Sequence, residues 1–147
     1  MSLSGTLRPI RTAIVDILTT ANLKVDGEGV KIIEGERAHI SEIYPPAIWI
    51  FYENSPITHA GSAIAEEWSL RFTIASVIKN EDPAVAIDQA EDLASNARDA
   101  IIASRTLNNS VRDVIPLQFL PAYSRGGESV HIYGAGFSFE ARFRYEG

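Results

Sequence analysis

The chain has 147 residues, a length that one domain with an ordinary hydrophobic core explains. It contains no cysteine, which excludes disulfide frameworks, thiolate zinc sites and thiol nucleophiles. Its 13 basic and 19 acidic side chains give a formal charge of −6, which repels a phosphate backbone, so we expect no nucleic-acid partner.

Two elements are predicted at the start of the chain. Residues 7–21 place apolar side chains at three- and four-residue spacings, which predicts an amphipathic helix. Thr6 or Ser4 would cap this helix, and Pro9 would fall in its first turn. A short strand or hairpin is expected next, with its turn at residues 26–29.

The longest apolar run, residues 47–52, is AIWIFY. Its β-branched and aromatic residues predict a strand that is buried on both faces and sits centrally in a sheet. Six residues are far fewer than the roughly 20 that a membrane-spanning helix needs, so we expect no membrane partner. Residues 53–65 are small and polar, which indicates a long loop or an extended hairpin tip; such loops are often functional.

Apolar and polar residues alternate over 68–74, which predicts a strand with one solvated face. The alternation blurs at Ala75 and Val77, which we interpret as a bulge. A second helix is predicted with Asp82 as N-cap and Pro83 in first position. Its many alanines indicate close packing on a sheet, with an inner face made of Ile87, Ala90, Leu93, Ala94, Ala97 and Ile101.

The last third predicts a strand at 111–120, a loop at 121–129 and a final strand at 130–145. The final strand could reach roughly 50 Å, an unusual length that suggests an arm or an interface edge. We expect Arg142 and Arg144 on its polar face. Four aromatic side chains on its other face should be mainly buried: Tyr133, Phe137, Phe139 and Phe143.

The order helix, strands, helix, strands, without a regular βαβ repeat, predicts an α+β fold. We expect a single antiparallel or mixed β-sheet with two α-helices packed on one face. Residues 1–147 should form one domain, in which residues 1–3 and 146–147 are candidate cloning remnants.

No pattern typical of catalysis or cofactor binding appears in the sequence. The histidines, His39, His59 and His131, lack the spacing that would place two of them on one helical face, so no metal site is predicted. A nucleophile elbow, a phosphate-binding loop and a dinucleotide fingerprint are absent. We interpret Gly134 and Gly136 as allowing a bend or the close approach of a neighbouring backbone. The sequence therefore predicts no enzyme and no cofactor.

Charged residues on the final strand are candidates for contacts between subunits. Glu140, Arg142 and Arg144 alternate on its polar side, and Arg125 is the nearest other basic residue. We add His59, from the long loop, as a further candidate oligomer or tail-tube contact. The alternative is a solvated face with weak cross-strand pairs, worth about 0.2–1 kcal/mol each.

Four segments in this order resemble the small tail-terminator subunits of phages and prophages, also described as tail-completion or minor tail proteins. The segments are the helix LRPIRTAIVDIL, the strands PAIWIFY and WSLRFTIASV, and the helix DPAVAIDQAEDLASNARDAI. The resemblance is one of pattern over most of the chain, so it carries over no site residue.

The resemblance implies a non-enzymatic subunit that assembles with itself into a ring, commonly a hexamer. The ring would stop growth of the tail tube and offer a docking surface to the head, so the implied partners are the tail tube protein and the head–tail connector. The implied location is the bacterial cytoplasm during assembly and then the virion tail.

Two alternatives stay open at this point. One is a small-ligand-binding or enzymatic domain with a site at residues 53–66, using His59, His131 or Glu66. The other is a head-completion or neck subunit, or a general protein-interaction domain.

Overall fold

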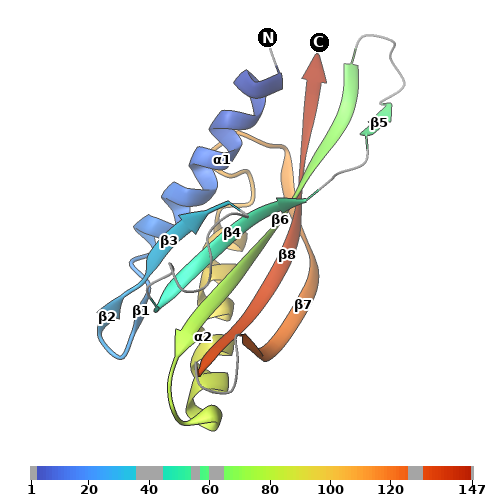
Figure 1. Ribbon diagram of the computed structural model, residues 1–147. Helices are drawn as coiled ribbons and strands as arrows, with labels where there is room; N and C mark the ends of the chain where they lie inside the picture. The colour runs from blue at the N-terminus through green and yellow to red at the C-terminus, as the bar shows by residue number, and fades with distance from the viewer. Residues whose placement is uncertain (1–2, 36–44, 54–56, 60–64, 126–130, 147) are drawn as a thin grey trace.

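The computed structural model describes residues 3–35, 45–53, 57–59, 65–125 and 131–146 (Figure 1). The predicted α+β fold is confirmed. Its elements are α1 Leu3–Thr20, β1 Lys24–Val25, β2 Glu28–Gly29, β3 Lys31–Glu34, β4 Ala47–Glu53, β5 Ile57–His59, β6 Ala65–Lys79, α2 Pro83–Ala103, β7 Asp113–Arg125 and β8 Ile132–Glu146.

A six-stranded mixed sheet has the order β3-β4-β6-β8-β7, and β5 adds to β6 beside that path. The β3–β4 pair is parallel, and the other pairs of this sheet are antiparallel. The strand predicted to sit centrally, β4, is therefore an interior strand, but the central strand of the sheet is β6. Both helices lie on one side of the sheet, as predicted (Figure 1).

The predicted hairpin forms a separate two-stranded sheet of β1 and β2, which amends the expectation of a single sheet. Asp26 and Gly27 both have positive φ, 51° and 79°. That geometry closes a tight two-residue hairpin whose twist matches its strands.

Helix α1 begins one turn before the predicted residue 7. Ser4 and Thr6 are therefore helical residues, and neither caps the helix as expected. Pro9 lies beyond the first turn, where its fixed φ still suits a helix although it lacks the N–H donor. The three- and four-residue spacing is confirmed by the buried side chains of Ile10, Ala13, Ile14 and Leu18.

Helix α2 begins as predicted, with Pro83 in its first turn and the Asp82 carboxylate accepting from the Ala84 N–H at 3.1 Å. One inner-face assignment is wrong: Ile87 is exposed, and Ala86 is buried instead. The inner stripe runs in four-residue steps through Ala86, Ala90 and Ala94, which turns Ile87 toward the rim.

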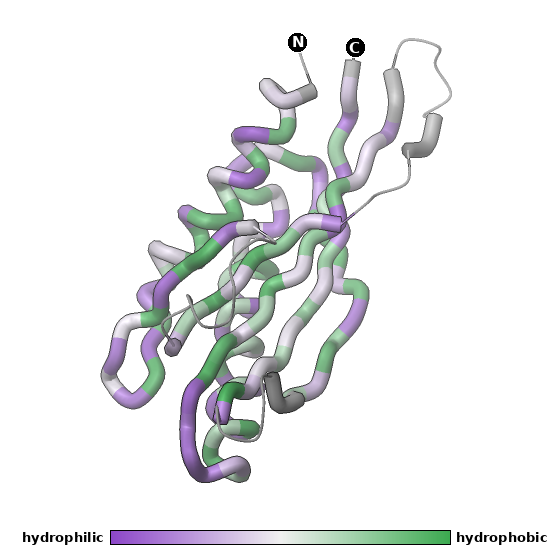
Figure 2. Tube along the Cα trace, viewed as in Figure 1, coloured by the Kyte–Doolittle hydropathy of each residue, from purple (hydrophilic) through white to green (hydrophobic). Residues whose placement is uncertain are grey.

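The helices and the sheet enclose the main core. Phe72 on β6 and Phe139 on β8 are both fully buried and stack with their ring centroids 5.2 Å apart. Figure 2 shows apolar residues along the sheet and polar residues at the turn between β6 and α2. The side of the sheet that α2 covers is therefore set by the apolar stripes of β6 and β8.

The predicted bulge near Ala75 and Val77 is wrong. The register of β6 does not shift against β4 or β8. Ala75 and Val77 lie on the face opposite Ile74 and are themselves buried. The alternation blurs because both faces are covered at this end, where Val77, Ala47 and Ile132 form a second apolar cluster.

Register shifts occur in β7 instead, between Pro116 and Gln118 and between Leu120 and Tyr123. Strand β7 also continues to Arg125, so the first part of the loop predicted at 121–129 is strand. The rest of that loop, residues 126–130, lies outside the described residues.

The final strand is confirmed as β8. Phe139 and Phe143 are buried, as expected, whereas Tyr133 and Phe137 are only half-buried. Phe137 faces the edge strand, where its ring lies 4.9 Å from that of Phe119. The Arg98 guanidinium of α2 lies over the same ring, 5.7 Å from its centroid, so Phe137 is covered by partly exposed side chains.

The segment predicted as a loop or hairpin tip at 53–65 contains strand β5, which pairs with β6. This pairing confirms the hairpin alternative for residues 57–59. Residues 54–56 and 60–64 lie outside the described residues.

Candidate interaction surface

Charged side chains gather on the face of the sheet that points away from the helices. Cross-strand pairing sets Glu67 opposite Arg144, Ser69 opposite Arg142 and Arg71 opposite Glu140. Strand β7 adds Asp113 beside Arg142. Because side chains alternate along a strand, all of these lie on one face. We call this set, together with Arg112, the polar face: Glu67, Ser69, Arg71, Arg112, Asp113, Glu140, Arg142 and Arg144.

Glu140 is the buried carboxylate of the polar face. Its oxygens lie 3.9 Å from Arg71 Nε and 3.4 Å from Arg142 Nη2. The side chains of Arg71 and Arg142 are 41% and 51% exposed, against 11% for Glu140. The carboxylate therefore lies beneath two guanidinium groups that reach toward solvent.

A second acid–arginine contact repeats this layering. Arg112 Nη1 donates to both carboxylate oxygens of Glu67, at 3.0 and 2.9 Å. The Arg112 side chain is 67% exposed and that of Glu67 is 25% exposed. Glu67 is thus a partly buried anchor for an arginine at the surface.

At the edge of the polar face, Arg105 binds Asp113 through two parallel hydrogen bonds of 3.1 and 3.2 Å. This bond to Arg105 holds the pKa of the Asp113 carboxyl below its usual range. Asp113 also accepts from the Val114 N–H at 2.9 Å, so the pair fixes the start of β7.

The structure brings together three of the five predicted contact residues. Glu140 and Arg142 are in contact, and Arg144 lies on the same face. Arg125 pairs with Ile132, ten positions along β8 from Arg142, or about 33 Å at ~3.3 Å per residue. His59 pairs with Glu66 at the β5–β6 hairpin. Arg125 is therefore far from the other four, whereas the backbone of His59 lies near that of Arg144, because Glu66 and Glu67 pair with Tyr145 and Arg144.

Sequence reasoning missed Arg71, Arg112 and Glu67 as members of this surface. The solvated side of the predicted 68–74 strand already contained Arg71. Arg112 reaches Glu67 across 45 positions of sequence, a pairing that only the fold creates.

Groups suited to catalysis are scarce in the part of the chain that the structure describes. Within those residues, no three His, Cys, Asp or Glu side chains come together as a metal site would require. His131 has a positive φ of 51°, and its carbonyl accepts from the Asn80 N–H at 3.1 Å. The main chain of His131 thus continues the pairing of β6 with β8 by one position beyond Lys79 and Ile132.

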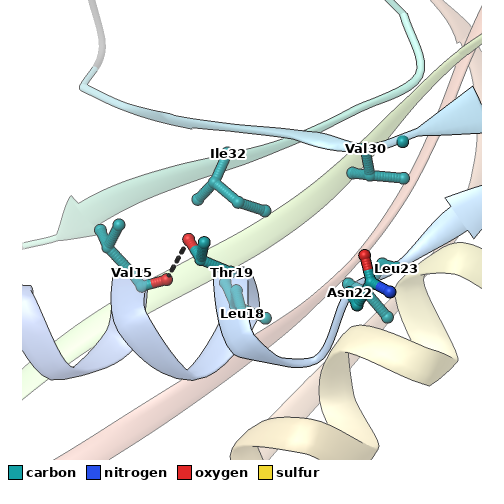
Figure 3. A pocket seen from close by; sticks show the side chains of 8 residues that line it. Val15, Leu18, Thr19, Asn22, Leu23, Val30 and Ile32 are labelled. Atoms are coloured by element: carbon teal, nitrogen blue, oxygen red, sulfur yellow. Dashed lines mark hydrogen bonds between the residues drawn. The ribbon is translucent and has the colours of Figure 1, made fainter.

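A groove of about 340 Å³ lies between the C-terminal part of α1 and strand β3 (Figure 3). Its labelled side chains are mostly apolar, and the Thr19 hydroxyl donates to the Val15 carbonyl at 2.8 Å. None of its lining residues is charged: they are Val15, Leu18, Thr19, Asn22, Leu23, Gly29, Val30 and Ile32. The groove therefore supplies no acid, base or ion-pairing group.

Among the described residues, no helix combines the length and apolar character needed to cross a bilayer.

The molecule is thus an α+β protein with two helices on one face of a mixed sheet and an arginine–carboxylate array on the other. No known protein family matches the sequence, and no curated protein matches it. One solved structure to which the chain is similar is the virion of a native gene transfer agent particle. That alignment covers 98% of this chain and 96% of the other at 13% identity, with a TM-score of 0.36. A superposition this loose carries no argument about function.

Proposed function

We propose that the chain is a structural subunit of a phage or prophage tail. It acts as a tail terminator: copies assemble into a closed ring that caps the tail tube and joins it to the head. The observation that carries the proposal is the polar face, where buried Glu140 holds Arg71 and Arg142 with their guanidinium groups toward solvent. Arginine side chains that already lie against a buried carboxylate lose less freedom when a second protein docks than isolated ones do.

Apolar side chains at the surface also favour protein contacts. Leu117 and Phe119 on edge strand β7 are exposed, as are Val85 and Ile87 on α2. Arginine and aromatic residues are enriched where protein interfaces form. Together with the pattern resemblance of the four segments, these surfaces support assembly as the role of the chain.

A closed ring requires one interface repeated between identical subunits until it closes. Two different patches of each subunit take part in such an interface. The two helices cover one side of the sheet (Figure 1), and the polar face is on the other side. The polar face and the outer surface of the helices are therefore two different patches of one subunit.

The proposal is tested by adding the purified chain to tail tubes assembled from the tube protein of the same genome. We expect electron microscopy to show a ring at one end of each tube, and capped tubes to stop growing when more tube protein is added. Light scattering and native mass spectrometry then give the number of subunits in the ring. A chain that stays monomeric and leaves tube growth unchanged would contradict the proposal.

The same mixture separates a terminator from a neck subunit. A terminator binds tube ends before any head component is present. A chain that ignores tube ends but binds the isolated head–tail connector would instead be a head-completion or neck subunit.

A further inference from the structure

The outer side of helix α2 carries most of its charge. Asp88, Asp92 and Asp99 are exposed and Glu91 is half-buried, whereas Arg98 is the one basic residue of the helix and pairs with Asp99 at 3.5 Å. Asp88 and Asp92 are four residues apart, so they are neighbours on the helix surface and repel each other. We call Asp88, Glu91, Asp92 and Asp99 the acidic side of α2.

The polar face exposes arginine side chains above its carboxylates. In its central ion pairs the arginine is the more exposed partner: 51% for Arg142 against 11% for Glu140, and 67% for Arg112 against 25% for Glu67. In these ion pairs of β6, β7 and β8 the outermost groups are therefore guanidinium groups, although the whole chain has a formal charge of −6. On β4 the exposed carboxylate of Glu53 lies on the same face, opposite Arg71.

These two surfaces cannot meet within one molecule. Helix α2 packs on the sheet through Ala90, whose carbonyl accepts from Ser76, and its acidic side points away from the sheet. The polar face is the other side of the same sheet. Two complementary patches on opposite sides of one chain form a head-to-tail contact between copies.

We infer that the polar face of one copy docks the acidic side of α2 of a second copy. This inference rests on the proposed self-assembly and names the surfaces that form its repeated contact. Guanidinium and carboxylate groups form strong, geometrically defined hydrogen bonds. A second copy supplies a row of carboxylates on a rigid helix, whereas a phosphate polymer would also have to approach the remaining acidic surface of the chain.

The test uses two full-length variants with reversed charge. The helix variant is Asp88→Lys with Asp92→Lys, and the sheet variant is Arg142→Glu with Arg144→Glu. We expect each variant alone to self-associate at least tenfold more weakly than the wild type in light scattering over a concentration series. An equimolar mixture should associate again, because the reversed helix then meets the reversed sheet face.

A matched control reverses two exposed acids elsewhere, Asp16→Lys with Glu28→Lys, which changes the net charge as the helix variant does. We expect this control to associate like the wild type. Because Glu140 is buried, the reversed sheet variant could fail to fold, so Arg142→Gln with Arg144→Gln is measured beside it. This neutral pair should also weaken association, with an unchanged circular dichroism spectrum.

Three results overturn the inference. The first is a helix, sheet or neutral variant that self-associates as strongly as the wild type, and the second is a mixture in which association does not recover. The third is a wild-type chain that binds a 30-base-pair DNA duplex through Arg142 and Arg144 but does not bind to itself. If every variant still forms rings that cap tubes, the proposed interface is wrong and the terminator function stands. If self-association recovers in the mixture but the wild type does not bind tubes, the terminator function is wrong and the proposed interface stands.

Discussion

The hydroxyl oxygen of Ser76 on β6 lies 2.7 Å from the main-chain oxygen of Ala90 on α2, so one polar contact joins the sheet to the helix. The same oxygen accepts from the Ala135 N–H at 3.1 Å. The β6–β8 partners stop at Ala75 and resume at Ile78 in unchanged register. The Ser76 hydroxyl thus fills a local gap in the ladder beneath the helix.

Replacement of Ser76 should therefore destabilise the protein. Ser76→Ala leaves the buried Ala135 N–H without this acceptor, and we expect a loss of about 1–3 kcal/mol in the free energy of unfolding. Urea denaturation followed by circular dichroism measures it. Ser95→Ala, on the exposed side of α2, is the control and should stay within about 0.5 kcal/mol of the wild type. Equal effects at the two serines would contradict the role of Ser76.

The two phenylalanines Phe139 and Phe119 should differ sharply in their contribution to stability. Phe139 is fully buried against Phe72, so Phe139→Ala should cost about 3–5 kcal/mol in the free energy of unfolding. Phe119 is 44% exposed on the edge strand, and we expect Phe119→Ala to cost roughly 1 kcal/mol or less. Thermal and urea unfolding of both variants check the difference. Similar losses would contradict the assignment of Phe139 to the core and of Phe119 to the partly solvated edge.

Gly136 should tolerate no side chain. A Cβ at this position would lie 2.9 Å from the Ile74 carbonyl oxygen, a backbone atom of the neighbouring strand. We expect Gly136→Ala to lower the free energy of unfolding by about 1–3 kcal/mol. Gly29→Ala is the matched control, because nothing lies within 4 Å of its added Cβ. A neutral Gly136→Ala would show that the two strands can separate at no cost.

Asp113 should add to stability only where it is ionised. Its pKa is lowered in the folded chain by the hydrogen bond from Arg105, so the stabilisation is present above the unfolded value near 3.8 and is lost as pH falls through the folded value. We expect the stability difference between wild type and Asp113→Asn to vanish at the acid end of a pH series. Arg105→Gln should reproduce this profile. A difference that is independent of pH would contradict the ion pair.

The strongest periodic patterns predicted the fold well. The alternation of β8 and the helical spacing of α2 are confirmed, because each element buries one face against a single layer. Gly136 was interpreted as a position of close backbone approach, and the Ile74 carbonyl confirms this. These features depend on residues close together in sequence.

Other features depended on packing that the sequence does not reveal. The apolar residues Ala75 and Val77 resembled a bulge because a second cluster covers the far face of β6. The polar face joins β6 to the start of β7, so the pairing of Arg112 with Glu67 appears only in the folded chain. The grouping of Glu140, Arg142 and Arg144 was predictable because all three lie on one strand.

Proline on the outer strand of the sheet limits how copies can join. Pro116 pairs with Phe139 in β7, and proline within a sheet is confined to edge strands, strand starts and bulges because it has no N–H to donate. An incoming strand would therefore meet a missing donor, and beyond it the register shifts that bend the edge. The opposite edge, β3, is only four residues long. Among the residues that the structure describes, both outer strands of the sheet thus disfavour growth from one molecule into the next, as a chain that avoids fibrous aggregation requires.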